Sequence, residues 1–194
     1  ADFDNDGLKD LFITNGYVRD YTNMDFLKFM GDKLKRIEGN VKREDVLELV
    51  QQMPSSNLKN YLFKNNPDFT FSNVGSNWGF DQTANSSGAA YADLDNDGDL
   101  DLVVNNVNSP AFLYRNDSDK EAGNNFLSVK LVGSGKNTLG VGAKVKVYAS
   151  NQIQYLEQMP TRGYQSSVSP TLHFGVGKSL KIDSISVIWL SGKM

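Results

Sequence analysis

One short acidic segment occurs twice in the chain, as ADFDNDGLKD from Ala1 and as ADLDNDGDLD from Ala92. Numbered from its first aspartate, each copy has acidic residues at positions 1, 3, 5 and 9 and a glycine at position 6. In the two copies these residues are Asp2, Asp4, Asp6, Asp10 and Gly7, and Asp93, Asp95, Asp97, Asp101 and Gly98. Like charges this close together repel one another unless a cation lies between them. The repeat therefore predicts two loops that each enclose a hard cation.

Calcium is the ion that such a loop fits. Ca²⁺ takes roughly six to eight oxygen ligands in a flexible shell, and alternate carboxylates with a backbone carbonyl at position 7 supply them. That carbonyl belongs to Leu8 in the first copy and to Asp99 in the second. Glycine at position 6 permits the sharp turn around the ion. We expect two calcium sites, and the alternative is a pair of solvated acidic turns.

The EF-hand is the rival with a similar loop, but it ends in a bidentate glutamate at position 12 and lies between two helices. Position 12 is Ile13 in the first copy and Val104 in the second, and neither side chain binds a metal. The residues around them form short apolar runs, which favour buried strands. Each loop is therefore expected to lead into a strand, with the aspartate at position 9 closing the ligand shell.

The net negative charge of the chain comes from these two loops. The formal net charge is -3, and nine of the 23 acidic residues belong to the repeated segments. The remaining 14 acidic residues face 20 basic ones, and two bound Ca²⁺ would bring the net charge to +1. This balance argues against a general attraction to nucleic acid. The absence of cysteine excludes disulfides, thiol catalysis and Cys-based zinc sites.

The repeat continues beyond the loops. LFITN (11–15) is followed by YLFKNN (61–66), and LVVNN (102–106) is followed by FLYRND (112–117). Each unit thus runs from loop to strand to an aromatic strand that ends in a basic residue and Asn. Strand-rich repeats of this kind are typical of propeller blades, which bury their faces against their neighbours.

The first unit carries an insertion of about 40 residues, roughly 17–58, with helical rather than strand periodicity. A start resembling a capping box at Thr22 precedes the first helical segment, and Pro54 follows the second. The apolar residues at helical spacing are Leu27, Met30, Leu34 and Ile37, then Val46, Leu47, Val50 and Met53. We expect two short helices at the edge of the propeller. Their basic residues are interpreted as a solvated helix face: Lys33, Lys35, Arg36, Lys42 and Arg43.

A polar link at 118–124 separates this region from a C-terminal part with a different pattern. FLSVKLVG, GAKVKVYAS, QIQYLEQM and DSISVIWL alternate apolar and polar residues, which predicts strands of a small antiparallel sandwich or barrel. We therefore expect a mainly β chain with two domains. Residues 1–118 would form propeller blades with two calcium loops, and residues 119–194 a separate all-β domain. The chain begins without Met and reads as a segment of a longer protein.

The matching segments resemble known families. DFDNDGLKD, DLDNDGDLD, YLFKNN and FLYRND are similar to FG-GAP or VCBS-type repeats and, more distantly, to the calcium blades of integrin α-subunits. LGVGAKVKVY, RGYQSSVSPTLHFGVG and ISVIWLSG resemble the ASPIC/UnbV domain. The order of these segments, calcium repeats followed by the ASPIC/UnbV-like domain, resembles a cartilage-acidic-protein-like architecture. The helical insertion in the first repeat suggests a Bacteroidetes-like cell-surface member. The resemblance implies a secreted or envelope location and a binding role.

Catalytic signals are weak. The sequence contains no G-x-S-x-G, H-E-x-x-H or phosphate-loop motif, and its dense carboxylates are committed to the metal loops. His173, the single histidine, is interpreted as a packed, hydrogen-bonded residue. The polar stretch from Tyr164 to Ser167 is interpreted as a hydrogen-bonded turn, with ligand contact as the alternative. Three aromatic residues could stack on sugar rings, but we interpret them mainly as residues of the hydrophobic core: Tyr61, Trp78 and Phe80.

We therefore expect a calcium-stabilised binding or adhesion module without catalytic activity of its own. Its partner would be a protein or a glycan at the cell surface rather than nucleic acid, and this segment has no apolar run long enough to span a membrane. The expected location is extracellular or associated with the outer membrane, with the periplasm as the alternative. Two other functions stay open: an accessory subunit of an outer-membrane uptake or secretion complex, and a fragment of a carbohydrate-active enzyme.

Overall fold

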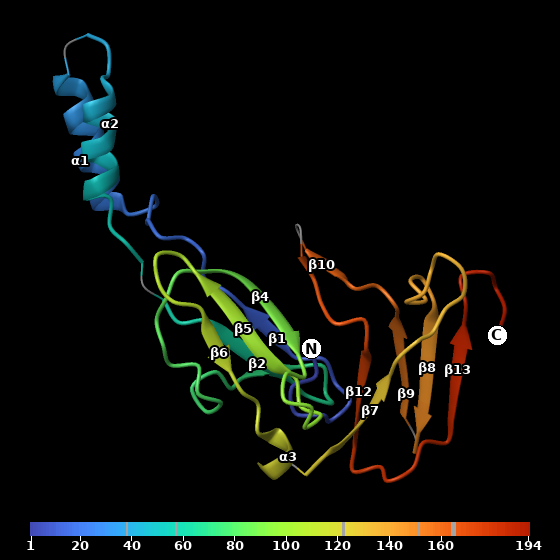
Figure 1. Ribbon diagram of the computed structural model, residues 1–194. Helices are drawn as coiled ribbons and strands as arrows, with labels where there is room; N and C mark the ends of the chain where they lie inside the picture. The colour runs from blue at the N-terminus through green and yellow to red at the C-terminus, as the bar shows by residue number, and fades with distance from the viewer. Residues whose placement is uncertain (38, 57, 122, 151, 164–165) are drawn as a thin grey trace.

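The computed structural model describes residues 1–37, 39–56, 58–121, 123–150, 152–163 and 166–194. Within these ranges the chain is mainly β, with several small antiparallel sheets and few helices (Figure 1). None of the helices in the described ranges has the length and apolar character needed to cross a bilayer. The mainly β character agrees with the alternating sequence pattern.

Two three-stranded antiparallel sheets make up the part that contains the metal loops. The first has the order β1-β2-β3, with β1 (Leu11–Ile13), β2 (Tyr61–Asn65) and β3 (Phe71–Asn73). The second has the order β4-β5-β6, with β4 (Ser86–Ala92), β5 (Asp101–Asn106) and β6 (Phe112–Tyr114). The expected strands after each loop are therefore confirmed. Each loop leads directly into a strand, β1 in the first sheet and β5 in the second.

One apolar cluster unites these two sheets. Leu102 and Val104 of β5 are buried while Val103 between them is exposed, as expected from the alternation of side chains along a strand. The ring of Phe80 lies 4.4 Å from that of Tyr114 and 5.5 Å from that of Phe12. The buried members of this cluster are Phe3, Leu62, Phe80, Leu100, Leu102 and Val104. Phe3 and Leu100 come from the metal loops, so the loops are anchored in the core.

The insertion forms the two expected helices, α1 (Met24–Arg36) and α2 (Arg43–Gln52). Asn23 caps α1, because its side-chain oxygen accepts the N–H of Phe26 at 2.9 Å. Figure 1 shows this helical hairpin (α1 and α2) standing away from the sheets, rather than lying along their edge. Phe26 and Leu49 are buried, and a set of apolar side chains is exposed: Leu27, Leu34, Val46, Leu47 and Val50. The hairpin therefore adds nothing to the core of the sheets.

The C-terminal part is built from short antiparallel sheets around a second core. Strand β12 (Leu172–Gly177) pairs with β7 (Asn125–Val129), and a three-stranded sheet has the order β13-β8-β9. The other elements are α3 (Ser118–Glu121), β8 (Lys144–Ala149), β9 (Gln152–Glu157), β10 (Thr161–Gly163), β11 (Ser166–Ser167) and β13 (Ser184–Ile188). Alternate residues of β8 and β12 supply the buried cluster, among them Val145, Val147, Leu172 and Phe174.

Strand β12 also packs against the first metal loop. The N–H of Gly177 donates to the carbonyl of Asn5 at 2.8 Å. A Cβ atom at Gly175 would lie 2.4 Å from Oδ2 of Asp2 and 2.6 Å from the backbone of Asn5, so only glycine fits there. The contact joins residues far apart in the sequence, and it places the first loop against strand β12 of the C-terminal part.

Candidate metal centre

The two acidic loops fold into the same backbone shape. Asn5 and Asn96, at position 4, both have left-handed φ angles, 58° and 62°. Gly7 and Gly98, at position 6, have φ angles of 95° and 94°. Asparagine and glycine are the residues that tolerate this region best, which explains why the N-D-G triplet recurs. The repeated sequence therefore specifies a repeated conformation.

The same local hydrogen bonds stabilise both loops. In each, the N–H at position 5 donates to the carboxylate at position 3, and the N–H at position 7 donates to the carboxylate at position 5. These bonds turn the acidic side chains inward. They join Asp6 to Asp4 at 3.4 Å, Leu8 to Asp6 at 2.8 Å, Asp97 to Asp95 at 3.4 Å and Asp99 to Asp97 at 3.0 Å.

The aspartate at position 9 closes each loop onto the aromatic strand. The two oxygens of Asp10 accept the N–H groups of Phe3 and Asn65, at 2.9 and 3.0 Å. In the second loop, the two oxygens of Asp101 accept the N–H groups of Leu94 and Asn116, at 2.9 and 2.8 Å. Each carboxylate oxygen keeps a further lone pair, so these bonds still leave room for a cation. Asn65, the last residue of β2, and Asn116, two residues after the end of β6, are thus part of the site, which the repeat of Asn at that position signalled.

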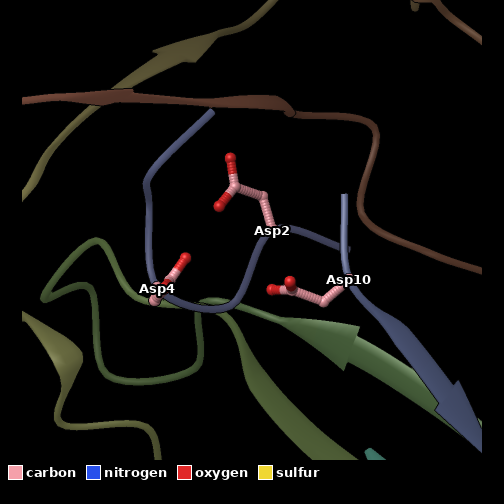
Figure 2. A group of neighbouring side chains, drawn as sticks. All are labelled: Asp2, Asp4 and Asp10. Atoms are coloured by element: carbon pink, nitrogen blue, oxygen red, sulfur yellow. The ribbon is translucent and has the colours of Figure 1, made fainter. Parts of the chain in front are cut away.

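Each loop brings three carboxylates together. Ligand oxygens of Asp2, Asp4 and Asp10 all lie within 4.8 Å of one another, and Figure 2 shows these side chains on the inner side of the loop. In the second loop the group within the same distance is Asp93, Asp95 and Asp97. Asp6 and Asp101 belong to the same loops but lie outside these two groups of three.

Burial makes these carboxylates unusual. Asp2 is fully buried, with 0% of its surface exposed, and Asp10 is 6% exposed. Among the described residues, Oδ1 of Asp2 and Oδ1 of Asp93 are both buried without a hydrogen-bond partner. Burying a carboxylate oxygen without a partner is costly, and a cation removes that cost. The donor set, oxygen atoms only, fits a hard divalent cation such as Ca²⁺.

The pKa shifts of two aspartates in the first loop agree with a site for a cation. Burial raises the pKa of Asp2 to about 7, against the lowering effect of Lys9 and with additional raising by Asp6, Asp10 and Asp4. Burial also raises the pKa of Asp10, although backbone hydrogen bonds oppose the shift. Without a cation, the loop therefore does not favour its fully ionised form.

Lys64 is a member of the first site that the sequence reasoning missed. Its Nζ atom contacts Oδ2 of Asp4 and lies 2.9 Å from Oδ2 of Asp6. Burial by itself would lower the pKa of Lys64, but hydrogen bonds to Asp4 and Asp6 outweigh burial and raise it. The corresponding Arg115 pairs with Asp117 instead, at 3.0 Å. The basic residue at the end of both aromatic strands was a signal in the sequence.

The other candidate residues lie apart from the acidic clusters or at their border. Tyr164 and Gln165 lie outside the described residues, and Ser166 and Ser167 form β11. Phe80 is buried and Trp78 packs against the first core, whereas Tyr61 is exposed, so the core interpretation is wrong for Tyr61. His173 is hydrogen-bonded as expected: its Nε2 atom lies 2.6 Å from Oδ1 of Asn5, inside the first loop.

Comparison with known proteins matches both parts of the chain. Residues 43–104 match the FG-GAP-like repeat, and residues 133–194 match the family described as ASPIC and UnbV. The chain is 31% identical over 112 residues to cartilage acidic protein 1 of Homo sapiens and 30% identical to those of Mus musculus and Xenopus tropicalis. These alignments cover 56% of this chain but only 16% or 17% of the relatives, so the chain spans less than a fifth of their length. The chain therefore combines an FG-GAP-like repeat with an ASPIC/UnbV segment, in the order that the sequence predicted.

Proposed function

We propose that this chain is a calcium-stabilised binding module of the cell surface or the extracellular space, without catalytic activity of its own. The observation that carries the calcium assignment is the buried, unpartnered Oδ1 atom at position 1 of both loops, Asp2 and Asp93, among the residues described. One such atom in isolation has many explanations. The same atom at the same place in two loops of one shape points to a shared ligand.

The aspartates at positions 1, 3, 5 and 9 would hold each ion, with the carbonyl at position 7. The ion supplies positive charge and several coordination bonds at the place where the carboxylates converge. The resulting role is structural, because each loop leads into a strand and contributes an apolar residue, Phe3 or Leu100, to the first core. The ion would stabilise the turn that aligns loop, strand and core.

The proposed architecture follows from the two cores. We assign residues 1–118 to propeller blades, formed by the sheets β1-β2-β3 and β4-β5-β6 and interrupted by the hairpin. Residues 119–194 would be the second, sandwich-like domain. The FG-GAP-like and ASPIC/UnbV matches support this division, since each falls largely on one side of it.

The helical hairpin supports a role in binding protein rather than sugar. Its exposed apolar side chains include Leu34, Val46 and Val50, and contact with a protein partner would bury them. The three aromatic residues considered for sugar stacking give less support, because Phe80 is buried and Trp78 packs on the core, which leaves Tyr61 as the exposed one of the three. This observation also favours an accessory subunit of a surface complex over a carbohydrate-active enzyme.

Calorimetric titration of the metal-free chain with calcium tests the metal assignment. We expect two ions to bind, and Asp2→Asn and Asp93→Asn each to remove one of them. Asp183→Asn, an exposed carboxylate outside both loops, is the control and should bind two. No uptake at millimolar calcium would refute the assignment.

Deletion of the hairpin tests the binding role. Because Asp20 N–H donates to the Pro54 carbonyl at 2.7 Å, the two ends of the hairpin already lie together. A short link replacing residues 21–53 should therefore leave both calcium sites and the strand signal in circular dichroism intact. Binding to protein partners from the cell surface should be lost. Unchanged partner binding would place the interaction elsewhere on the chain.

A further inference from the structure

Asn5 occupies an unusual place in the first loop. It lies at position 4, between Asp4 and Asp6, and is 2% exposed. Its counterpart Asn96 has the same left-handed backbone but is exposed to solvent. A buried amide needs hydrogen-bond partners for both its oxygen and its nitrogen. The buried Asn5 therefore needs hydrogen-bond partners within the protein, whereas water can serve the exposed Asn96.

The side chain of Asn5 reaches the second loop. Its Nδ2 atom donates to Oδ1 of Asp99 at 2.8 Å and lies 3.4 Å from the carbonyl of Gly98. A carboxylate only accepts hydrogen bonds, so the contact with Asp99 fixes which end of the amide is nitrogen. Oδ1 of Asn5 then accepts from Nε2 of His173 at 2.6 Å. The amide is thus held at both ends, by the second loop and by strand β12.

The residues that Asn5 binds are the ones that shape the second loop. Gly98 provides the left-handed turn at position 6. Asp99 follows it at position 7, where the backbone carbonyl is the assigned ligand, and its N–H donates to Oδ1 of Asp97 at 3.0 Å. Asp99 is also buried, with 1% of its surface exposed. Any movement of Asn5 is therefore transmitted to the ligands at positions 5 and 7 of the other loop.

We propose that Asn5 is a positioning residue that couples the two calcium loops, so that an ion in one loop raises the affinity of the other. This inference rests on the proposed calcium function. An ion in the first loop would fix Asp4 and Asp6 and hence Asn5 between them. The second loop would then lose less conformational freedom when it binds its own ion, and linkage makes the effect reciprocal.

The direction of the change in calcium affinity distinguishes ordering through Asn5 from direct repulsion between the two ions. Two divalent ions in neighbouring loops repel one another, so a purely Coulombic connection would lower the second affinity. Ordering through Asn5 raises it instead. Couplings of this kind typically change affinity by roughly 5- to 150-fold, and a single side chain with two hydrogen bonds belongs at the low end.

The test measures the calcium affinity of each loop, first when the other loop can bind an ion and then when a substitution prevents it from doing so. Asp2→Asn leaves the second loop to be titrated by itself, and Asp93→Asn leaves the first. We expect each loop to bind calcium about 5- to 10-fold more tightly in the parent chain than in the matching single-loop variant. Asn96→Gly, which removes an exposed asparagine at the same loop position, should keep this factor. Asn5→Gly keeps the left-handed backbone and both ion sites but should bring the factor close to one.

Hydrogen exchange gives a second measurement that does not depend on resolving two affinities. In the Asp93→Asn variant, loading of the first loop should slow exchange of the Asp97 and Asp99 amides, and adding Asn5→Gly should remove that protection. His173→Phe, which removes the donor to Asn5, should weaken it. Two ions bound independently in the parent chain would overturn the coupling but leave the calcium function standing. Equal coupling in Asn5→Gly and Asn96→Gly would exclude Asn5 as its carrier.

Discussion

The first metal loop packs against strand β12 and buries Asp2, Asp4 and Asp10, whereas positions 1 to 5 of the second loop are at least partly open to solvent. Both loops have nearly the same sequence, backbone angles and internal hydrogen bonds. The first also has Lys64 against its carboxylates, while the basic residue of the second, Arg115, points to Asp117. One local structure is thus placed in two electrostatic settings. The loop sequence thus specifies the shape of the loop, whereas we expect the surroundings to set its ion affinity and its pH response.

The largest expected effect comes from Gly175→Ala. A Cβ atom there would lie 2.4 Å from Oδ2 of Asp2, so β12 and the first loop must separate. We expect a loss of about 3 kcal/mol in the free energy of unfolding, together with a loss of calcium affinity that is larger at the first loop than at the second. Thermal melting and calorimetry measure the two effects. Gly88→Ala is the control, since open space surrounds that position. Equal loss at both loops would show that β12 supports them together.

The second effect is that of Asp95→Ala, which removes a ligand from the open loop. We expect the free energy of unfolding to fall by about 2 kcal/mol in saturating calcium and to change little in a chelator, because only the ion-bound form uses that oxygen. Melting curves with and without calcium give the comparison. A similar fall in both conditions would show that Asp95 acts through its hydrogen bond to Asp97.

The pH dependence of the metal-free chain should come mainly from the buried loop. Burial raises the pKa of Asp2 from 3.8 to about 7, so its protonated form favours folding. That contribution is complete below about pH 4 and is lost as the pH rises through 7. In a chelator, the melting temperature should therefore fall across this range, and Asp2→Asn should reduce the fall. With calcium bound, the trend should disappear, since the ion favours the ionised form.

The smallest expected effect is that of Lys64→Gln. Removing the ammonium group from Asp4 and Asp6 should raise calcium affinity at the first loop about tenfold, because the ion no longer competes with a bound charge. The metal-free chain should become slightly less stable. Arg115→Gln should leave the affinity of the second loop nearly unchanged. Calorimetry on both variants measures these calcium affinities. Equal gains in affinity at the two loops would mean that the basic residues act at long range.

Much of this arrangement was readable from the chain. The glycine at position 6 predicts the turn at Gly7 and at Gly98, and the apolar run at 102–104 predicts strand β5. The spacing of the apolar residues and the capping-box-like start at Thr22 predict helix α1, which the structure caps one residue later, with Asn23. Each of these depends on neighbours within a few residues, which is why local patterns suffice to predict them.

The sequence by itself thus determined the loop shape, the strands that follow it and the set of oxygen donors on which the proposed calcium assignment rests. Only the tertiary structure decided which loop is buried, that Lys64 lies against Asp4 and Asp6, and that the helical hairpin stands apart from the core. It also decided that Asn5 binds Asp99 and His173, residues 94 and 168 positions away. The physical reason is that hydrogen-bond geometry within a loop is set by nearby dihedral angles. Burial and charge at the loop depend instead on segments that meet only after the whole chain has folded.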